Sequence, residues 1–128
     1  MIFLTTEQVL FIHSRIISET GGSHGVRDLG LLESAVARPR STYEGRNQYP
    51  DLFAKAAALM HSLVNNHPFV DGNKRTGVAS AALFLRRNGW KLTVSSDDLE
   101  SITLRVTSGN VPINELSNWL RSNSVGLS

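Results

Sequence analysis

The residues best suited to chemistry lie together in the nine-residue stretch from His67 to Arg75, His-Pro-Phe-Val-Asp-Gly-Asn-Lys-Arg. An imidazole titrates near neutral pH, so His67 can take a proton from an attacking hydroxyl group. Asp71 can hold Mg²⁺ together with substrate phosphates, or it can simply cap a helix. Pro68 stiffens the loop, and Phe69 is expected to anchor it on the core. The stretch therefore predicts chemistry on a phosphate-containing substrate.

The end of this stretch is also the predicted start of a helix over residues 73–87. A helix N-terminus has backbone N–H groups without partners and a partial positive charge, so it binds anions. Gly72 lacks a Cβ where a phosphate must approach the backbone. Lys74 and Arg75 are cations at the helix end where the dipole disfavours them, which indicates function. Asn73 can donate to a phosphate oxygen or hold the shape of the loop.

Each of these residues also has a purely structural interpretation. A single histidine is more often a surface or hydrogen-bonded core residue than a catalytic one. Asp71-Gly72 alone would be a turn, and Lys74 and Arg75 alone would be a solvated helix face. A base, a carboxylate, a glycine and two cations at one helix start are hard to explain as structure alone.

The surrounding sequence is typical of an all-α domain, a bundle of about six helices with the helix at residues 73–87 central and buried. Apolar spacing, capping residues, glycines and prolines place the helices. They are expected from Thr5 or Thr6 to Gly21-Gly22, from Asp28 to before Pro39, over 51–64 and 73–87, from Ser95 or Ser96 to Gly109, and over 113–121. Residues 90–94 form a short strand or a connector, and residues 39–50 form a long loop without periodicity.

Length and composition narrow the class of protein. With 128 residues, 41% apolar and 19% charged, the chain is predicted to be a single domain, residues 1–128. Cysteine is absent, which excludes thiolate metal sites and suits a reducing cytosol. Neither a signal peptide nor an apolar run of membrane-spanning length is found, so a cytoplasmic protein without membrane attachment is expected. The net charge of +2 is small and the basic residues are scattered, so direct nucleic-acid binding is not expected.

Residues 67–76, His-Pro-Phe-x-Asp-Gly-Asn-Lys-Arg-Thr, resemble the motif of the Fic/Doc superfamily in the variant found in death-on-curing (Doc) toxins. The flanking residues 22–39, 56–61 and 84–90 resemble the same family, so the likeness extends over nearly the full length. The resemblance implies that His67 is the general base, that Asp71 is the Mg²⁺ ligand, and that Gly72 to Arg75 hold the phosphates.

The resemblance has two further structural implications. The loop from Arg40 to Pro50 would be a flap that holds the target peptide in extended form. Glu33 and Arg38 would lie at the rim of the pocket, although an internal hydrogen-bonded pair that fixes the second helix explains them equally well.

Two positions separate the chain from adenylyl-transferring Fic proteins. Lys74 stands where those proteins have glycine, and Val78 stands where they have a second arginine. Both residues resemble the Doc branch, in which the nucleotide binds turned around with its γ-phosphate facing the histidine. This implies phosphoryl transfer from ATP, with Mg²⁺, to a Ser or Thr hydroxyl of a protein.

Other functions stay open at this point. Adenylyl or other nucleotidyl transfer on the same fold is the first alternative, and a catalytically decayed binding module is the second. A ribonuclease toxin using His67 and Lys74 is the third, but it would need a basic groove or stacking aromatics.

The resemblance also implies partners. The chain would be the toxin of a toxin–antitoxin pair, with translation elongation factor Tu as the protein substrate and arrested translation as the result. No self-inhibiting helix with the Ser/Thr-x-x-x-Glu pattern is found, and Ser14 to Ser18 lacks the glutamate. Inhibition would therefore come from a cognate antitoxin whose disordered tail covers the site.

Overall fold

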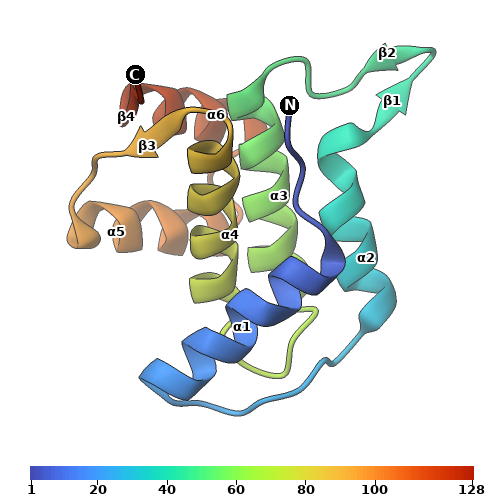
Figure 1. Ribbon diagram of the computed structural model, residues 1–128, viewed down its shortest axis with the longest axis vertical. Helices are drawn as coiled ribbons and strands as arrows, with labels where there is room; N and C mark the ends of the chain where they lie inside the picture. Colours follow the sequence, from blue (N-terminus) through green and yellow to red (C-terminus); the bar gives the residue numbers. More distant parts are fainter.

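Two adjacent helices, α3 (Leu52–Asn66) and α4 (Asn73–Arg87), form the centre of the computed structural model, which describes residues 1–128 (Figure 1). The other helices pack around this pair: α1 (Thr6–Thr20), α2 (Leu29–Ala37), α5 (Ser96–Thr107) and α6 (Ile113–Ser122). The all-α prediction with six helices is confirmed, and no helix is both long and apolar enough to cross a bilayer.

Most helices begin where the sequence predicts, because a polar side chain caps the first turn. Thr5, Asp28, Asp51 and Ser95 accept backbone N–H groups at the starts of α1, α2, α3 and α5. The central place of α4 is confirmed, although α3 contains ten buried residues and α4 seven, so α3 is the more deeply buried of the two. Close approach of the pair depends on Gly77, where a Cβ would lie 2.7 Å from Val64 Cγ2.

Two small two-stranded sheets complete the fold. The possible strand at residues 90–94 is confirmed as β3 (Trp90–Leu92), and it pairs with β4 (Ser124–Gly126), which was not predicted. Within the predicted loop 39–50, the chain forms the hairpin of β1 (Thr42–Tyr43) and β2 (Arg46–Asn47).

Helix α2 ends at Ala37, as Pro39 requires, but the chain continues through a 3₁₀ turn, Arg38–Arg40. A proline at the start of such a turn breaks no hydrogen bond. The C-terminal end of α3 is Asn66, two residues beyond the predicted end. His67 therefore follows directly after the helix.

Candidate active site

His67 caps the C-terminus of α3 in a left-handed conformation, with φ 50° and ψ 57°. This conformation costs a residue with a Cβ about 1 kcal/mol or more, so the surrounding structure must hold it in place. The side chain of Arg27 does so: Nε donates to the carbonyl of His67 at 2.6 Å, and Nη2 donates to the carbonyl of Asn66 at 2.8 Å. The imidazole itself is exposed and free of intramolecular hydrogen bonds, so it is available to a substrate.

The backbone of the motif loop is held by the segment between α1 and α2. The carbonyl of Pro68 accepts the N–H groups of Arg27 and Asp28, at 2.8 and 3.0 Å, and Val70 donates to the carbonyl of Gly25 at 3.1 Å. We call residues Gly22–Asp28 the bracket segment. It passes alongside the motif loop below α1 in Figure 1, and it fixes the loop without occupying the side chain of His67.

Phe69 anchors the loop on the core, as the sequence predicts. Its ring is buried and stacks on the ring of His13 with centroids 3.8 Å apart. Asn73 binds both backbone groups of Phe69, accepting from its N–H at 2.9 Å and donating to its carbonyl at 3.0 Å. Of the two roles open to the side chain of Asn73, it therefore performs the structural one, and only its backbone N–H remains for an anion.

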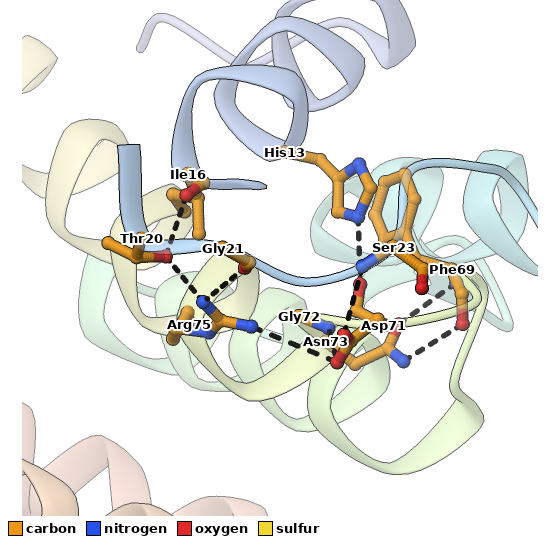
Figure 2. Close-up of polar contacts among 10 residues, drawn as sticks. All are labelled: His13, Ile16, Thr20, Gly21, Ser23, Phe69, Asp71, Gly72, Asn73 and Arg75. Atoms are coloured by element: carbon orange, nitrogen blue, oxygen red, sulfur yellow. Dashed lines mark hydrogen bonds and ion pairs between the residues drawn. The ribbon is translucent and has the colours of Figure 1, made fainter. Parts of the chain in front are cut away.

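Asp71 lies between the bracket segment and the start of α4 (Figure 2). Its Oδ2 accepts the N–H of Ser23 at 3.1 Å, and its Oδ1 accepts that of Gly72 at 2.8 Å. These two backbone donors hold the pKa of the Asp71 carboxyl below its usual value, and Arg75 adds a smaller effect. The group is therefore an ionised carboxylate at neutral pH.

A magnesium ion fits this carboxylate. The side chain of Asp71 is 46% exposed, and each oxygen keeps a lone pair beyond the hydrogen bond it accepts. No group of three His, Asp or Glu side chains that could hold a metal is found in the chain. A metal at Asp71 would thus take its other oxygens from water and substrate phosphates, which is the usual habit of Mg²⁺.

The start of α4 differs from those of α1, α2, α3 and α5, because Gly72 at the N-cap offers no side-chain acceptor. The first helical bond runs from the N–H of Thr76 to the carbonyl of Gly72 at 2.9 Å. The three preceding helical N–H groups thus have no partner within the helix. Gly72 has φ 77°, and a Cβ there would lie 3.0 Å from Ile17 Cδ1. The conformation therefore favours a glycine, and a Cβ would also force the tip of the Ile17 side chain to shift.

One cavity of about 390 Å³ collects the predicted site residues. Its lining is His67, Val70, Asp71, Gly72, Asn73, Lys74 and Arg75. The two cations differ within it. Arg75 donates to Thr20 Oγ1 and to the carbonyl of Gly21 (Figure 2), whereas Lys74 is exposed and has no hydrogen bond within the protein. Lys74 is therefore the cation that an anionic ligand can engage without breaking an existing contact.

Glu33 and Arg38 do not line this cavity, so the structure does not bring them to the rim where the sequence placed them. The alternative Glu33–Arg38 pair does not form either, since Arg38 donates to Tyr49 Oη at 2.8 Å and to Ser62 Oγ at 2.7 Å. Arg38 fixes the 3₁₀ turn to α3, and Glu33 is exposed.

The predicted flap also lies elsewhere. The β1–β2 hairpin precedes the N-terminal end of α3, whereas His67 follows the C-terminal end, and Figure 1 shows the hairpin and the loop between α3 and α4 at opposite ends of the helix. A helix of 15 residues separates its ends by about 22 Å. The hairpin is therefore not placed to hold a peptide over His67, and the bracket segment is the neighbour of the site.

Three residues outside the motif, Arg27, His13 and Gly22, contact the motif loop, and the sequence predicted no role in the site for them. Arg27 binds two carbonyls, His13 Nε2 is 2.8 Å from the carbonyl oxygen of Asp71, and a Cβ on Gly22 would lie 2.6 Å from Asp71 Oδ2. Their partners are mainly backbone atoms, which no residue pattern reveals. The adjacent Gly21-Gly22 pair was the available signal for close packing against the motif loop.

Known proteins with similar sequences share the motif region and the helices around it. The model of the Fic/DOC family matches residues 3–85. "Toxin Doc" from Mycolicibacterium smegmatis is 54% identical over 77 residues, which cover 60% of this chain and 59%, less than two thirds, of that protein. "Protein kinase doc" from Escherichia phage P1 is 33% identical over 120 residues, which cover 92% of each chain.

Proposed function

Because this chain belongs to the Fic/DOC family, we propose that it is a Doc-type protein kinase and the toxin of a toxin–antitoxin pair. It transfers the γ-phosphoryl group of ATP to a Ser or Thr hydroxyl of a cytoplasmic protein, elongation factor Tu, and so arrests translation. The observation that carries the proposal is the uncapped start of α4, which shares one cavity with Lys74 and the exposed imidazole of His67.

The residues of the cavity divide the reaction between them. His67 takes the proton of the attacking hydroxyl while the new O–P bond forms and the bond from the γ-phosphorus to the β-phosphate oxygen breaks, releasing ADP. The free N–H groups at the start of α4 and the ammonium group of Lys74 hold the phosphate oxygens in place. Mg²⁺ bound at Asp71 would supply additional neutralisation of phosphate charge.

The choice of phosphoryl rather than adenylyl transfer rests on Lys74 and Val78. Lys74 lies in the cavity with no intramolecular partner, so its charge is available to the terminal phosphate. Val78 lies one turn further along α4 and offers no cation for a second phosphate subsite. A single phosphate held beside His67 suits transfer of that phosphate.

A groove next to the site supports a cognate antitoxin as the inhibitor. Lys74 and Arg75 line both the cavity and this groove between α1, α4 and α5, whose other residues include Ile16, Val78, Leu99 and Leu104. An antitoxin tail with apolar side chains seated there would cover both cations. Leu104→Glu should therefore weaken inhibition by the antitoxin tail at least tenfold without changing uninhibited activity. An unchanged inhibition constant would exclude the groove as the binding site of the tail.

The experiment that tests the proposed reaction is label transfer to purified elongation factor Tu with Mg²⁺, comparing ATP labelled at the γ or the α phosphorus. Label from the γ position alone is the expected result. Label from the α position would establish nucleotidyl transfer and refute the argument from Lys74 and Val78. Labelling of another protein in a cell extract, but not of elongation factor Tu, would refute the proposed target and keep the kinase.

A further inference from the structure

Two arginines bind opposite ends of α3, and only one of them lies at the site. Arg121 of α6 donates from Nη2 to Asp51 Oδ2 at 2.9 Å, at the N-cap of α3, and from Nη1 to Asn118 Oδ1 at 3.2 Å. Arg27 of the bracket segment donates to the last carbonyls of the same helix, those of Asn66 and His67. Both arginines are at the surface and each makes two side-chain hydrogen bonds, but their partners differ in kind.

We infer that Arg27 is a positioning residue for the phosphoryl transfer proposed above, because it holds the backbone of His67 in the left-handed conformation that directs the imidazole into the cavity. The inference rests on the proposed function for its kinetic consequence, but its structural content can be measured without activity.

The argument begins with what holds His67 in place. Its imidazole has no hydrogen bond within the chain, so the backbone, which sets the direction of the Cα–Cβ bond, and the rotamer of the side chain decide where the imidazole points. The backbone has φ 50°, and the carbonyl of His67 accepts a 2.6 Å bond from Arg27 Nε. The planar guanidinium binds the carbonyl of Asn66 at the same time, so one rigid group contacts two consecutive peptide groups and restrains their relative orientation.

The backbone contacts of the bracket segment do not replace this side chain. The N–H groups of Arg27 and Asp28 reach the carbonyl of Pro68, which lies one residue after His67. They fix where the loop goes after the histidine, while the guanidinium fixes the peptide groups on either side of the histidine Cα atom. Removing the guanidinium therefore releases the two carbonyls that flank the φ and ψ torsions of His67, which set the direction of its Cα–Cβ bond.

The experiment compares Arg27→Ala, Arg27→Lys and the matched control Arg121→Ala in the full chain, with kcat and KM for ATP measured separately. A displaced base costs about 10²-fold in rate when the reacting atoms move by about 1 Å. We expect kcat of Arg27→Ala to fall 10- to 100-fold with KM for ATP within twofold, and Arg121→Ala to keep kcat within twofold. Arg27→Lys should be intermediate, because an ammonium keeps the charge but lacks the fork, and added guanidinium ion should restore part of the kcat of Arg27→Ala.

A second readout is independent of turnover: the three-bond H^N–H^α coupling and Cα chemical shift of His67, which report its φ. In Arg27→Ala and Arg27→Lys these should move towards values of an ordinary helical or extended residue, and in Arg121→Ala they should stay. An unchanged His67 signal in both Arg27 variants would overturn the inference, even if kcat fell. Equal losses of kcat in Arg27→Ala and Arg121→Ala would overturn it as well. If the wild type transferred no phosphoryl group, the proposed function would fail, while the coupling would still decide whether Arg27 sets the backbone.

Discussion

The two ends of α3 are built on different principles. At the C-terminal end, the motif loop is bonded to residues remote in sequence: Arg27 binds its carbonyls, Ser23 binds Asp71, and His13 stacks on Phe69. At the N-terminal end, the β1–β2 hairpin projects into solvent, and Tyr43 is 71% exposed. Both ends contain a residue with a Cβ at positive φ, His67 and Glu44, yet only His67 is fixed from outside.

The difference shows where this protein needs a fixed geometry. The proposed base His67, which would have to meet a hydroxyl and a phosphate, would tolerate little displacement, and the loop that bears it is held by many contacts. The hairpin is fixed only at its base, where the ammonium group of Lys55 binds the carbonyls of Pro39 and Tyr49. Five substitutions can break or sharpen this comparison.

The largest effect is expected from His67→Asn, which removes the proposed base. Asparagine accepts the left-handed conformation better than alanine does, so the fold should be preserved. We expect the rate of label transfer to fall by about 10²- to 10⁴-fold, the range typical of a lost general base. The melting temperature should stay within a few degrees of the wild type. Activity of a folded His67→Asn protein within fivefold of the wild type would remove His67 from the mechanism.

At the other end of α3, Lys55→Met should cost stability rather than chemistry. Lys55 is 5% exposed, and its loss leaves the buried carbonyls of Pro39 and Tyr49 without a donor. Each unsatisfied group costs about 1–3 kcal/mol, so for the two carbonyls unfolding in urea should show a loss of about 2–6 kcal/mol. The exposed Lys91→Met is the control for the same chemical change. A loss below that of the control would show that Lys55 does not hold the hairpin base.

Gly22→Ala should disturb the proposed metal ligand. Gly22 has φ 117°, and the new Cβ would lie 2.6 Å from Asp71 Oδ2, so the carboxylate must move. We expect about a tenfold higher Mg²⁺ concentration for half-maximal activity, which corresponds to about 1.4 kcal/mol. Gly21→Ala is the matched control, since its φ of 88° is also positive but nothing lies within 4 Å of the new Cβ. Equal Mg²⁺ dependence in both variants would contradict the role of Gly22.

A smaller effect is expected from His61→Gln on the pH dependence of stability. Burial, and then the charge of Arg38, lower the pKa of His61. Below about pH 6.5, His61 of the unfolded chain therefore binds a proton while His61 of the folded chain stays neutral. The free energy of unfolding falls as the pH drops from there towards the lowered pKa of the folded chain. The melting temperature should fall less between about pH 7.5 and pH 5.5 in His61→Gln than in the wild type. Parallel curves would show that His61 does not contribute.

The smallest effect is expected from Tyr43→Ala in the hairpin. Because the hairpin lies at the end of α3 remote from His67, we expect kcat and the KM for the protein substrate to remain within twofold. A tenfold rise in this KM with unchanged kcat would restore the hairpin as a surface that binds the target, and would place the substrate across the length of α3.

Much of the fold could be predicted because local rules decide it. The helices capped by Thr5, Asp28, Asp51 and Ser95 begin within about one residue of the predicted starts, and all residues of the motif from His67 to Arg75 except Pro68 and Phe69 line one cavity. The hairpin β1–β2 and the strand β4 were missed because strands of two or three residues contain little pattern, and the equally short β3 was predicted only as a strand or a connector.

What the sequence by itself determined is the set of helices and the start of α4 without a side-chain cap, since capping, apolar spacing and the lack of an N-cap side chain act between near neighbours in the chain. Only the tertiary structure decided that Arg27 holds His67, that the side chain of Asn73 is committed to Phe69, and that Glu33 and Arg38 stand away from the site. The reason is physical: backbone carbonyls and N–H groups are the same at every position, so the partner of each one depends on which distant segment packs against it.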